Sequence, residues 1–362
     1  MNLHLHLNRR QFASAAAALV ATTAGSPARA QATASELAAL EKAARSEGKI
    51  SSLGMPDGWA NWKDTWAELG RRYGLAHVDS DMNSAEEIAK MLAEGRNGTV
   101  DIGDVGFEFG AIARQRGVTA AFKPSTWAQI PAWAKDADGH WALAYTGTVA
   151  FAVNTRRVAS PVSSWKTLIA SKARVDIGEV GRAAQANAAV LAAALALGGD
   201  ESRLDAALQA FAQMAQQGRL LSVNPTPALM ERSEADVFVM WDFNALAFRD
   251  QLPNKADYAV LIPGDGSVTS GYTTIINAHA PHPNAARLAR ELIFSDAGQL
   301  NLARGYARPI RVDHLTLPAD LQARLLPASQ YQAARPIRNL DWTAATKTLG
   351  SRWQSTVLAN SK

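Results

Sequence analysis

Apolar residues recur along the chain in two alternating patterns. Over residues 35–48, Leu37, Leu40 and Ala44 recur at helical spacing, whereas residues 148–153 are nearly all apolar. The first pattern is that of an amphipathic helix, and the second is that of a strand buried on both faces of a parallel sheet. The alternation of such segments predicts an α/β fold built from packed layers.

Capping signals and glycines limit the predicted elements. The sequence Ser84-Ala85-Glu86-Glu87 has the S-x-x-E pattern of a capping box, in which Ser84 would cap a helix. Predicted strands span residues 49–54, 100–105, 145–153, 173–177, 236–241, 258–262 and 273–276. Predicted helices span residues 35–48, 62–73, 84–93, 165–170, 183–197, 204–217, 244–249, 284–294, 321–326 and 342 onward.

Length and composition favour a two-domain globular protein. The chain has 362 residues, of which 48% are hydrophobic and 19% are charged, so it can bury a sizeable core. It contains no cysteine. This excludes disulfides, cysteine-ligated zinc, iron–sulfur clusters and a lipid anchor on an N-terminal cysteine.

The positive charge belongs mostly to the first thirty residues. The formal net charge is +4, and residues 1–30 hold Arg9, Arg10 and Arg29 with no acidic residue. The remainder has 34 basic residues (37 minus 3) and 33 acidic residues, which leaves +1. Bulk charge therefore gives no reason to expect nucleic acid or an anionic membrane as a partner.

The amino-terminal segment has the three parts of an export signal. An Arg pair at positions 9 and 10 precedes an Ala-rich apolar run over residues 13–24 and an Ala28-Arg29-Ala30 cleavage site. The pair, with Phe12 two positions on, resembles a twin-arginine signal, and a general secretory signal is the alternative. We expect residues 1–30 to be cleaved and the mature protein to be periplasmic, with no membrane insertion.

The sequence lacks the common catalytic motifs. There is no G-x-S-x-G nucleophile elbow, no phosphate-binding G-x-x-x-x-G-K-S/T, no G-x-G-x-x-G and no H-E-x-x-H. His279 and His282 flank Pro281 in a predicted turn, which is typical of surface residues. We therefore expect no catalytic residue, no cofactor and no metal site, and a binding protein rather than an enzyme.

Four junctions resemble a strand that ends in a polar or aromatic loop and is followed by a helix, and such junctions are where open α/β sheets bind ligands. The candidate ligand-binding residues there are Asp57, Trp59, Asn61, Ser84, Asp104, Trp241, Asp242 and Asn244. An indole face can stack on a ligand or hold a cation, and a carboxylate can hold an amine. A structural alternative stays open for each junction. Trp59 can pack in the core, Ser84 can act only as a cap, Asp104 can form a turn, and Asp242 can cap a helix above Trp241.

Five further residues complete the candidate site, and they are Tyr145, Thr146, Thr148, Arg182 and Tyr272. The first three precede an apolar strand that would cross between two domains. Arg182 opens an Ala-rich helix and could meet a carboxylate or phosphonate with paired N–H donors, or it could simply be solvated.

The order of several segments resembles the periplasmic solute-binding proteins of ABC importers. More narrowly, it resembles the extracellular solute-binding group that includes ferric-iron, thiamine, polyamine and 2-aminoethylphosphonate binders. The segments are VDIGDV at residues 100–105, YTGTVAFAVNT at 145–155, residues 283–299, and GYARPIR at 305–311. Together they extend the resemblance over most of the mature chain.

This resemblance implies an α/β fold of the two-lobed, class II periplasmic-binding-protein type. Each lobe would be a mixed, mostly parallel sheet flanked by helices, and crossover strands would form a hinge. Lobe 1 would comprise residues 31–148 and 262–312, and lobe 2 residues 149–261 and 313–362. A monomer would bind a small-molecule solute between the lobes and deliver it to an ABC permease with its ATPase subunits.

The resemblance leaves the ligand open. Ferric binders of this group usually use an adjacent Tyr pair, and this chain has no Tyr-Tyr sequence. The aromatic and acidic candidates favour an amine-bearing organic solute, such as a polyamine, a thiamine-like compound or an aminophosphonate. The alternatives are a ferric-iron or other anion-chelate binding protein of the same family, and a secreted enzyme or sensor domain on this scaffold.

Overall fold

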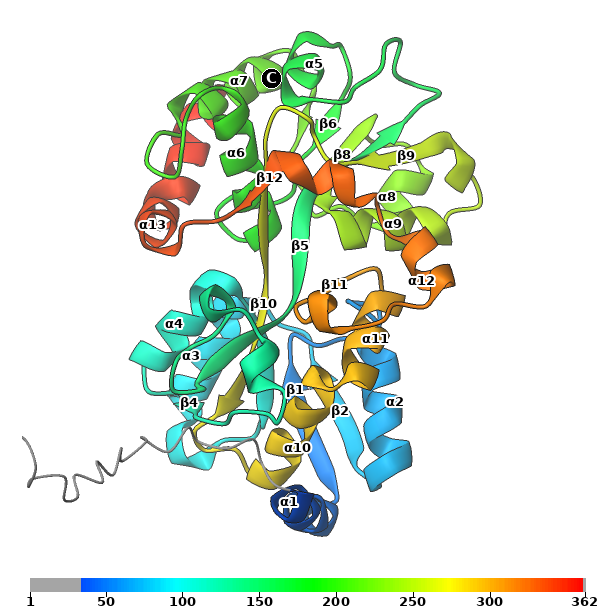
Figure 1. Cartoon of the computed structure of the whole chain (residues 1–362). Helices are drawn as coiled ribbons and strands as arrows, with labels where there is room; N and C mark the ends of the chain where they lie inside the picture. Colours follow the sequence, from blue (N-terminus) through cyan, green and yellow to red (C-terminus); the bar gives the residue numbers. More distant parts are fainter. Residues whose placement is uncertain (1–33, 361–362) are drawn as a thin grey trace, which may run out of the picture.

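Two lobes joined by two long strands make up the protein (Figure 1), which confirms the predicted two-lobed α/β fold. The computed structural model describes residues 34–360, so the predicted export signal over residues 1–30 lies outside the described residues. The long strands are β5 (Trp141–Asn154) and β10 (Ser267–Asn277), which pair antiparallel. Both are longer than the sequence pattern predicted, because their polar ends are also paired with neighbouring strands.

The first lobe contains a mixed sheet with the strand order β2-β1-β3-β10-β5. Its first three strands are parallel to one another, and β10 runs antiparallel to β3 and β5. The other strands of this lobe are β1 (Lys49–Leu53), β2 (Ala76–Ser80), β3 (Ile102–Gly106), β4 (Thr119–Ala120) and β11 (Arg308–Pro309). The helices are α1 (Ala34–Glu47), α2 (Trp62–Tyr73), α3 (Ser84–Glu94), α4 (Phe107–Gln115), α10 (Pro283–Phe294) and α11 (Asp296–Arg304).

The second lobe continues from the far half of β5 through the order β5-β8-β6-β7, with β9 also pairing with β5. Its strands are β6 (Val175–Asp176), β7 (Leu220–Leu221), β8 (Val237–Trp241) and β9 (Tyr258–Leu261). Its helices are α5 (Trp165–Ala170), α6 (Ala184–Ala196), α7 (Asp205–Gln216), α8 (Pro227–Glu231) and α9 (Asp242–Gln251). Because β5 pairs in both lobes, it forms a direct mechanical connection between the two sheets.

The carboxyl-terminal segment returns to the second lobe. It comprises α12 (Ala319–Arg324), β12 (Ala334–Pro336), which pairs parallel with β10, and α13 (Asn339–Thr356). Helix α13 packs against α7 of the second lobe and also touches α4 of the first lobe. Short 3-10 helices span Gly95–Asn97, Trp127–Gln129, Ala132–Ala134, Lys255–Asp257, Val312–His314, Ala328–Ala333 and Leu358–Asn360. The exact lobe boundaries stay a prediction.

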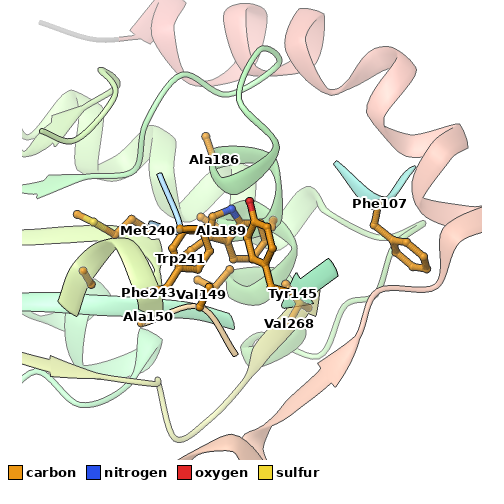
Figure 2. Packing of buried hydrophobic residues seen from close by; sticks show 14 of the residues in the cluster. Phe107, Tyr145, Val149, Ala150, Ala186, Ala189, Met240, Trp241, Phe243 and Val268 are labelled. Carbon is orange, nitrogen blue, oxygen red and sulfur yellow. The ribbon is translucent and has the colours of Figure 1, made fainter. Parts of the chain in front are cut away.

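Side-chain burial explains the helix placement. Trp62, Trp66, Leu69 and Tyr73 are buried, so the aromatic stripe predicted for α2 is its core face. The Ala-rich α6 is buried on nearly all sides, because it lies between the long strands and α7. Figure 2 shows the core where the lobes join, with the rings of Tyr145, Trp241 and Phe243 close together.

The cap of α3 differs from the prediction. Asn83, not Ser84, is the cap, because its side-chain oxygen accepts hydrogen bonds from the N–H groups of Ala85 and Glu86, both at 3.1 Å. The Glu86 carboxylate accepts from the Asn83 N–H in return at 3.2 Å, so the capping box begins one residue earlier than predicted. The Ser84 hydroxyl instead accepts a hydrogen bond from the Gly106 N–H at 2.9 Å, which joins α3 to the end of β3.

Candidate functional site

A cavity of about 400 Å³ lies between the two lobes. From the first lobe it is lined by the loop after β1, the amino-terminal turn of α3, the end of β3, and residues of α4 and β10. From the second lobe it is lined by the amino-terminal end of α6, the loop after β7, and α9. These are the strand ends and helix starts at which the sequence predicted a ligand.

Aromatic rings from both lobes form one end of this cavity. The Trp59 ring meets the rings of Tyr272 and Phe243 edge to face, each with centroids 5.4 Å apart. Tyr145 stacks on Tyr272 at 5.7 Å and meets Phe243 edge to face at 5.6 Å. Trp59 and Tyr272 line the cavity, whereas Tyr145 and Phe243 support them from behind. The arrangement gives the ligand flat, electron-rich surfaces.

A chain of hydrogen bonds connects Trp59 to a buried carboxyl group. The Trp59 indole N–H donates to the Tyr145 hydroxyl at 2.7 Å, and that hydroxyl donates to Asp104 Oδ2 at 2.7 Å. Burial raises the pKa of Asp104 to about 8, against the lowering effect of the Tyr145 hydroxyl and the Trp62 indole. Burial therefore favours the protonated form of Asp104 at neutral pH.

Glu87 is a second buried carboxyl group on the cavity wall. Its side chain is 0% exposed, and burial, followed by the charge of Asp104, raises its pKa well above the usual range. A Cβ atom placed on Gly103 would lie 2.5 Å from Glu87 Oε2, so glycine at this point of β3 makes room for the carboxyl group. The Asp104 backbone N–H lowers the pKa of Glu87, but less than burial raises it.

Several buried acceptor atoms on the cavity wall lack a donor. Within residues 34–360, both carboxyl oxygens of Glu87, Oδ1 of Asp104 and Oε1 of Gln185 have no hydrogen-bond partner of ordinary geometry. Buried acceptors are nearly always satisfied in folded proteins. Their common location therefore suits a ligand that brings hydrogen-bond donors, preferably with a positive charge.

Six of the thirteen predicted residues line the cavity, and they are Trp59, Ser84, Asp104, Arg182, Asn244 and Tyr272. They come from both lobes and from segments far apart in the sequence. Arg182 is exposed at the cavity edge, whereas Asp104 and Asn244 are buried.

The other predicted residues lie elsewhere. Asp57 is exposed to solvent on the loop after β1 and does not line the cavity. Asn61 donates hydrogen bonds to Asp64 and to the backbone oxygen of Asn301, so it fastens the start of α2 to α11. Tyr145 lies behind the wall, and Thr146 is buried in β5.

Trp241 and Asp242 are buried beneath the cavity rather than on its wall. The Asp242 carboxylate accepts hydrogen bonds from the Thr148 N–H at 2.8 Å and from the Tyr331 hydroxyl at 2.6 Å. Burial raises the pKa of Asp242 to about 6 in spite of these donors. Asp242 and Thr148 thus connect α9 to the crossing strand β5, and their visible role is structural.

The sequence analysis did not select several residues of the cavity wall, namely Glu87, Phe109, Gln185, Asn224 and Phe248. Glu87 stood within the S-x-x-E pattern and was interpreted only as a capping residue. Gln185 follows Arg182 by three residues at the start of α6, and this adjacency was the one signal that could have identified it. Phe109 and Phe248 carry no sequence signal that distinguishes a ligand-facing phenylalanine from one in the core.

The described residues were also searched for two other kinds of site. Between residues 34 and 360, none of the helices combines the length and apolar character needed to cross a membrane. The same part of the chain has no group of three or more His, Cys, Asp or Glu side chains placed to hold a metal ion.

Solved structures share this fold at low sequence identity. A periplasmic thiamin binding protein is 17% identical, with a TM-score of 0.69, over 85% of this chain and 96% of its own. The periplasmic binding protein AgtB from A. tumefaciens R10, in complex with agropinic acid, is 14% identical, with a TM-score of 0.70, over 86% and 99%. AfuA from Actinobacillus pleuropneumoniae, with fructose-6-phosphate bound, is 15% identical, with a TM-score of 0.68, over 85% and 98%.

Sequence comparison identifies the family. No curated protein matches the chain significantly. Residues 97–335 match the family model described as bacterial extracellular solute-binding protein, and this range includes the crossing strands and about half of the residues of the cavity wall. The family and the similar structures consist of binding proteins rather than enzymes. The chain therefore belongs to the bacterial extracellular solute-binding proteins.

Proposed function

We propose that this protein captures a small, amine-bearing organic solute between its lobes in the periplasm and delivers it to an ABC permease with its ATPase subunits. Residues 1–30 would direct export by the twin-arginine route and then be cleaved. The mature protein would act as a monomer without membrane insertion.

The buried acceptors on the cavity wall carry this proposal. Glu87 is 0% exposed and Asp104 2% exposed, and among the described residues their free oxygens meet no donor of ordinary geometry. An ammonium group offers three donors and one positive charge, so it can satisfy two carboxylates at once. Such charge-assisted hydrogen bonds are each worth about 1.5–3 kcal/mol. An anionic group at the same place would be repelled by the carboxylates, and a neutral group without N–H or O–H donors would leave the acceptors unsatisfied.

The aromatic end of the cavity supports the same ligand class. A cation over an indole or phenol face gains about 0.5–2 kcal/mol when it is shielded from water. Trp59 and Tyr272 offer such faces on the same cavity wall as Asp104 and Glu87. A cavity of about 400 Å³ also lies within the usual range for small-molecule sites. The similar structures carry ligands of varied chemistry, so they do not identify the ligand of this protein. The ligand class is therefore inferred from the residues of the cavity.

A thermal-shift screen of the mature protein tests the proposal. Purified residues 31–362 would be melted with polyamines, thiamine and ω-amino compounds, and with neutral isosteres, sugar phosphates and ferric complexes. A ligand at 100 times its Kd adds about 2.7 kcal/mol to stability. We expect amines to raise the melting temperature and their neutral isosteres to leave it unchanged.

Two variants give this screen its control. Glu87→Gln should abolish or strongly reduce the shift caused by amines, because it removes one of the two carboxyl groups that can ionise beside the ammonium group. Glu231→Gln, at an exposed carboxylate away from the cavity, should respond like the wild type. A shift with ferric complexes alone, or equal shifts in both variants, would contradict the proposal.

A further inference from the structure

Strained backbone gathers beside the aromatic end of the cavity. Among residues 34–360, four residues other than glycine have a positive φ, and three of them, Ala60, Asn61 and Tyr306, belong to two segments that touch each other. Ala60 and Asn61 directly follow Trp59, which lines the cavity. A side chain with a Cβ atom disfavours this left-handed region, so such residues persist only where their surroundings impose it. Conformations of this kind are concentrated at functional sites.

Tyr306 occupies a position that usually belongs to glycine. It follows the end of α11, where its N–H donates to the Ala303 carbonyl at 2.9 Å and the Ala307 N–H donates to the Leu302 carbonyl at 3.1 Å. This is the Schellman pattern, in which the left-handed residue after the helix is most often glycine. Tyr306 has a φ of 66° there, so its side chain is retained at a conformational cost.

The glycine of this turn stands one residue earlier, where it touches the loop that carries Trp59. A Cβ atom on Gly305 would lie 2.5 Å from the Ala60 carbonyl carbon and 2.6 Å from Asn61 Cβ. The Asn61 side chain also donates to the backbone oxygen of Asn301 at 3.0 Å. The end of α11 therefore fixes the Trp59 loop.

The Tyr306 side chain extends from the first lobe to the second. Tyr306 is 7% exposed, and its hydroxyl donates a hydrogen bond to Asp250 Oδ2 near the carboxyl end of α9. Burial raises the pKa of Tyr306, so the hydroxyl keeps the proton that it donates. Burial also acts to raise the pKa of Asp250, but the hydrogen bonds from Tyr306 and Arg249 outweigh it and lower that pKa. The contact is therefore a charge-assisted hydrogen bond between the lobes.

Helix α9 also carries residues of the cavity wall. Asn244 and Phe248 line the cavity from the second lobe, and Asp250 lies two residues beyond Phe248. Trp59 lines the same cavity from the first lobe. Tyr306 lies outside the cavity wall but is joined to both of its sides, to the Trp59 loop through the turn after α11 and to α9 through its hydroxyl.

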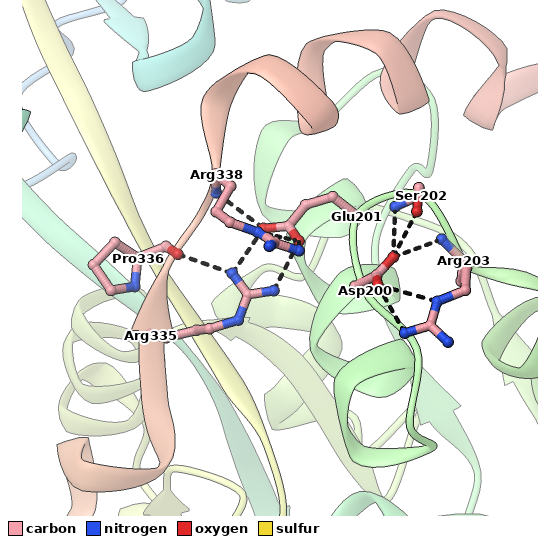
Figure 3. A network of polar contacts seen from close by, with 7 residues as sticks. All are labelled: Asp200, Glu201, Ser202, Arg203, Arg335, Pro336 and Arg338. Carbon is pink, nitrogen blue, oxygen red and sulfur yellow. Dashed lines mark hydrogen bonds and ion pairs between the residues drawn. The ribbon is translucent and has the colours of Figure 1, made fainter.

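The carboxyl-terminal segment covers the same tyrosine. The guanidinium carbon of Arg324, on α12, lies 4.4 Å from the centroid of the Tyr306 ring. Farther along, this segment is fixed to the second lobe by Glu201, which is 0% exposed and pairs with Arg335 at 2.7 Å and Arg338 at 2.8 Å (Figure 3). Two elements joined to the second lobe, α9 and α12, therefore contact the Tyr306 side chain.

We propose that Tyr306 is a positioning residue for solute capture, which holds the Trp59 loop and α9 at the spacing at which both cavity walls face one ligand. Separation of the lobes breaks the hydrogen bond from Tyr306 to Asp250, so this bond favours the binding-competent arrangement without touching the ligand. The apparent affinity rises with the fraction of the protein in that arrangement. The inference requires a solute between the lobes but not an amine, so it goes beyond the proposed function.

Distances between spin labels test this spacing without a ligand. Because the chain has no cysteine, Gln115→Cys on α4 and Gln213→Cys on α7 place one label on each lobe at exposed positions. Double electron–electron resonance then gives the ratio of near to separated lobes. We expect Tyr306→Phe and Asp250→Ala each to lower this ratio at least about threefold, and the double variant to lower it no further.

Affinity gives the second readout. Whichever compound of the thermal-shift screen, a polyamine, thiamine, a sugar phosphate or a ferric complex, gives the largest shift is titrated by calorimetry. Tyr306→Phe should bind it at least about threefold more weakly. Tyr258→Phe is the matched control, because the Tyr258 hydroxyl donates to the Met230 backbone oxygen at 2.6 Å within the second lobe, away from the cavity. It should lower the melting temperature but leave the label distances and the affinity as in the wild type.

A purely structural role for Tyr306 predicts a different pattern. In that case Tyr306→Phe would lower the melting temperature as Tyr258→Phe does, while the label distances and the affinity stay those of the wild type, and this result would overturn the inference. Additive effects of Tyr306→Phe and Asp250→Ala would overturn it too, since residues that act through one hydrogen bond are coupled. If only a compound without an amine binds and Tyr306→Phe weakens it, the proposed ligand class fails and this inference stands.

Discussion

Amine binding at Glu87 and Asp104 should strengthen as the pH rises. In the empty cleft Asp104 has a pKa of about 8, and burial holds that of Glu87 well above its usual range. An ammonium ligand needs ionised carboxylates, so binding must release protons. If one proton leaves a group with a pKa near 8, the affinity rises about 50-fold between pH 6 and pH 8 and then levels off.

The groups that surround the two carboxyls support this direction. On the β2 side, Asp79 and Asp81 add negative charge that raises the pKa of Glu87 further. Tyr145 on β5 and Tyr272 on β10 have pKa values raised by burial, so both stay neutral over this range. Proton release is therefore assigned to the carboxyl pair and not to the phenols.

Calorimetry can measure both the affinity and the protons. Titrations at pH 6, 7, 8 and 9, in two buffers with different ionisation enthalpies, give the number of protons released per ligand. Asp104→Asn should flatten the pH dependence, whereas the surface control Glu231→Gln should reproduce the wild type. An affinity constant within about twofold from pH 6 to 8, with no proton release, would refute the reasoning.

Three further predictions concern stability and single contacts. Glu201→Gln should destabilise the protein by about 1.5–3 kcal/mol in chemical denaturation, because it removes the charge that pairs with Arg335 and Arg338, whereas Asp200→Asn, in an exposed pair, should cost clearly less. Gly103→Ala should weaken amine binding at least about tenfold in calorimetry, since its Cβ would displace Glu87; unchanged affinity would contradict the close packing. Trp59→Leu should weaken amine binding about 3- to 30-fold, and an equal loss for a neutral isostere would argue against a cation–π contribution.

The buried carboxyls also make the empty protein sensitive to pH. Because the pKa of Asp104 is higher in the folded than in the unfolded state, its contribution to stability is fully present below about pH 4 and is lost as the pH rises through about 8. An amide side chain has the shape of the protonated carboxyl group but cannot ionise, so it does not lose this contribution to stability as the pH rises. Asp104→Asn should therefore lose less stability than the wild type between pH 5 and pH 8, although it binds amines less well. Melting temperatures of both proteins at pH 5 and pH 8 test this.

Local sequence patterns were sufficient to predict much of the fold. The aromatic stripe of α2 and the apolar run within β5 each reflect one dominant burial requirement, so periodicity identified both. The edge strand β2 was missed, because its residues alternate between exposed and half-buried positions and include charged and polar types. The extra length of β10 depends on pairing with β3 and β5, which no local pattern contains.

The site was harder to predict than the fold. In the sequence, Trp59 and Trp241 are both indoles in segments that follow or end a predicted strand, and Asp104 and Asp242 are both carboxylates near such an end. Their different roles follow from position, because β8 lies between β5 and β6 and its end is buried beneath the cavity. Glu87 matched a capping pattern, and its burial arises from neighbouring strands that only the folded chain assembles.

A crystal structure of the mature protein with the tightest amine from the screen would test amine capture most directly. The account predicts the ammonium nitrogen within about 3 Å of carboxylate oxygens of both Glu87 and Asp104, with Trp59 and Tyr272 against the ligand. An ammonium group that faces solvent, or a ligand bound outside the cleft between the lobes, would contradict the account.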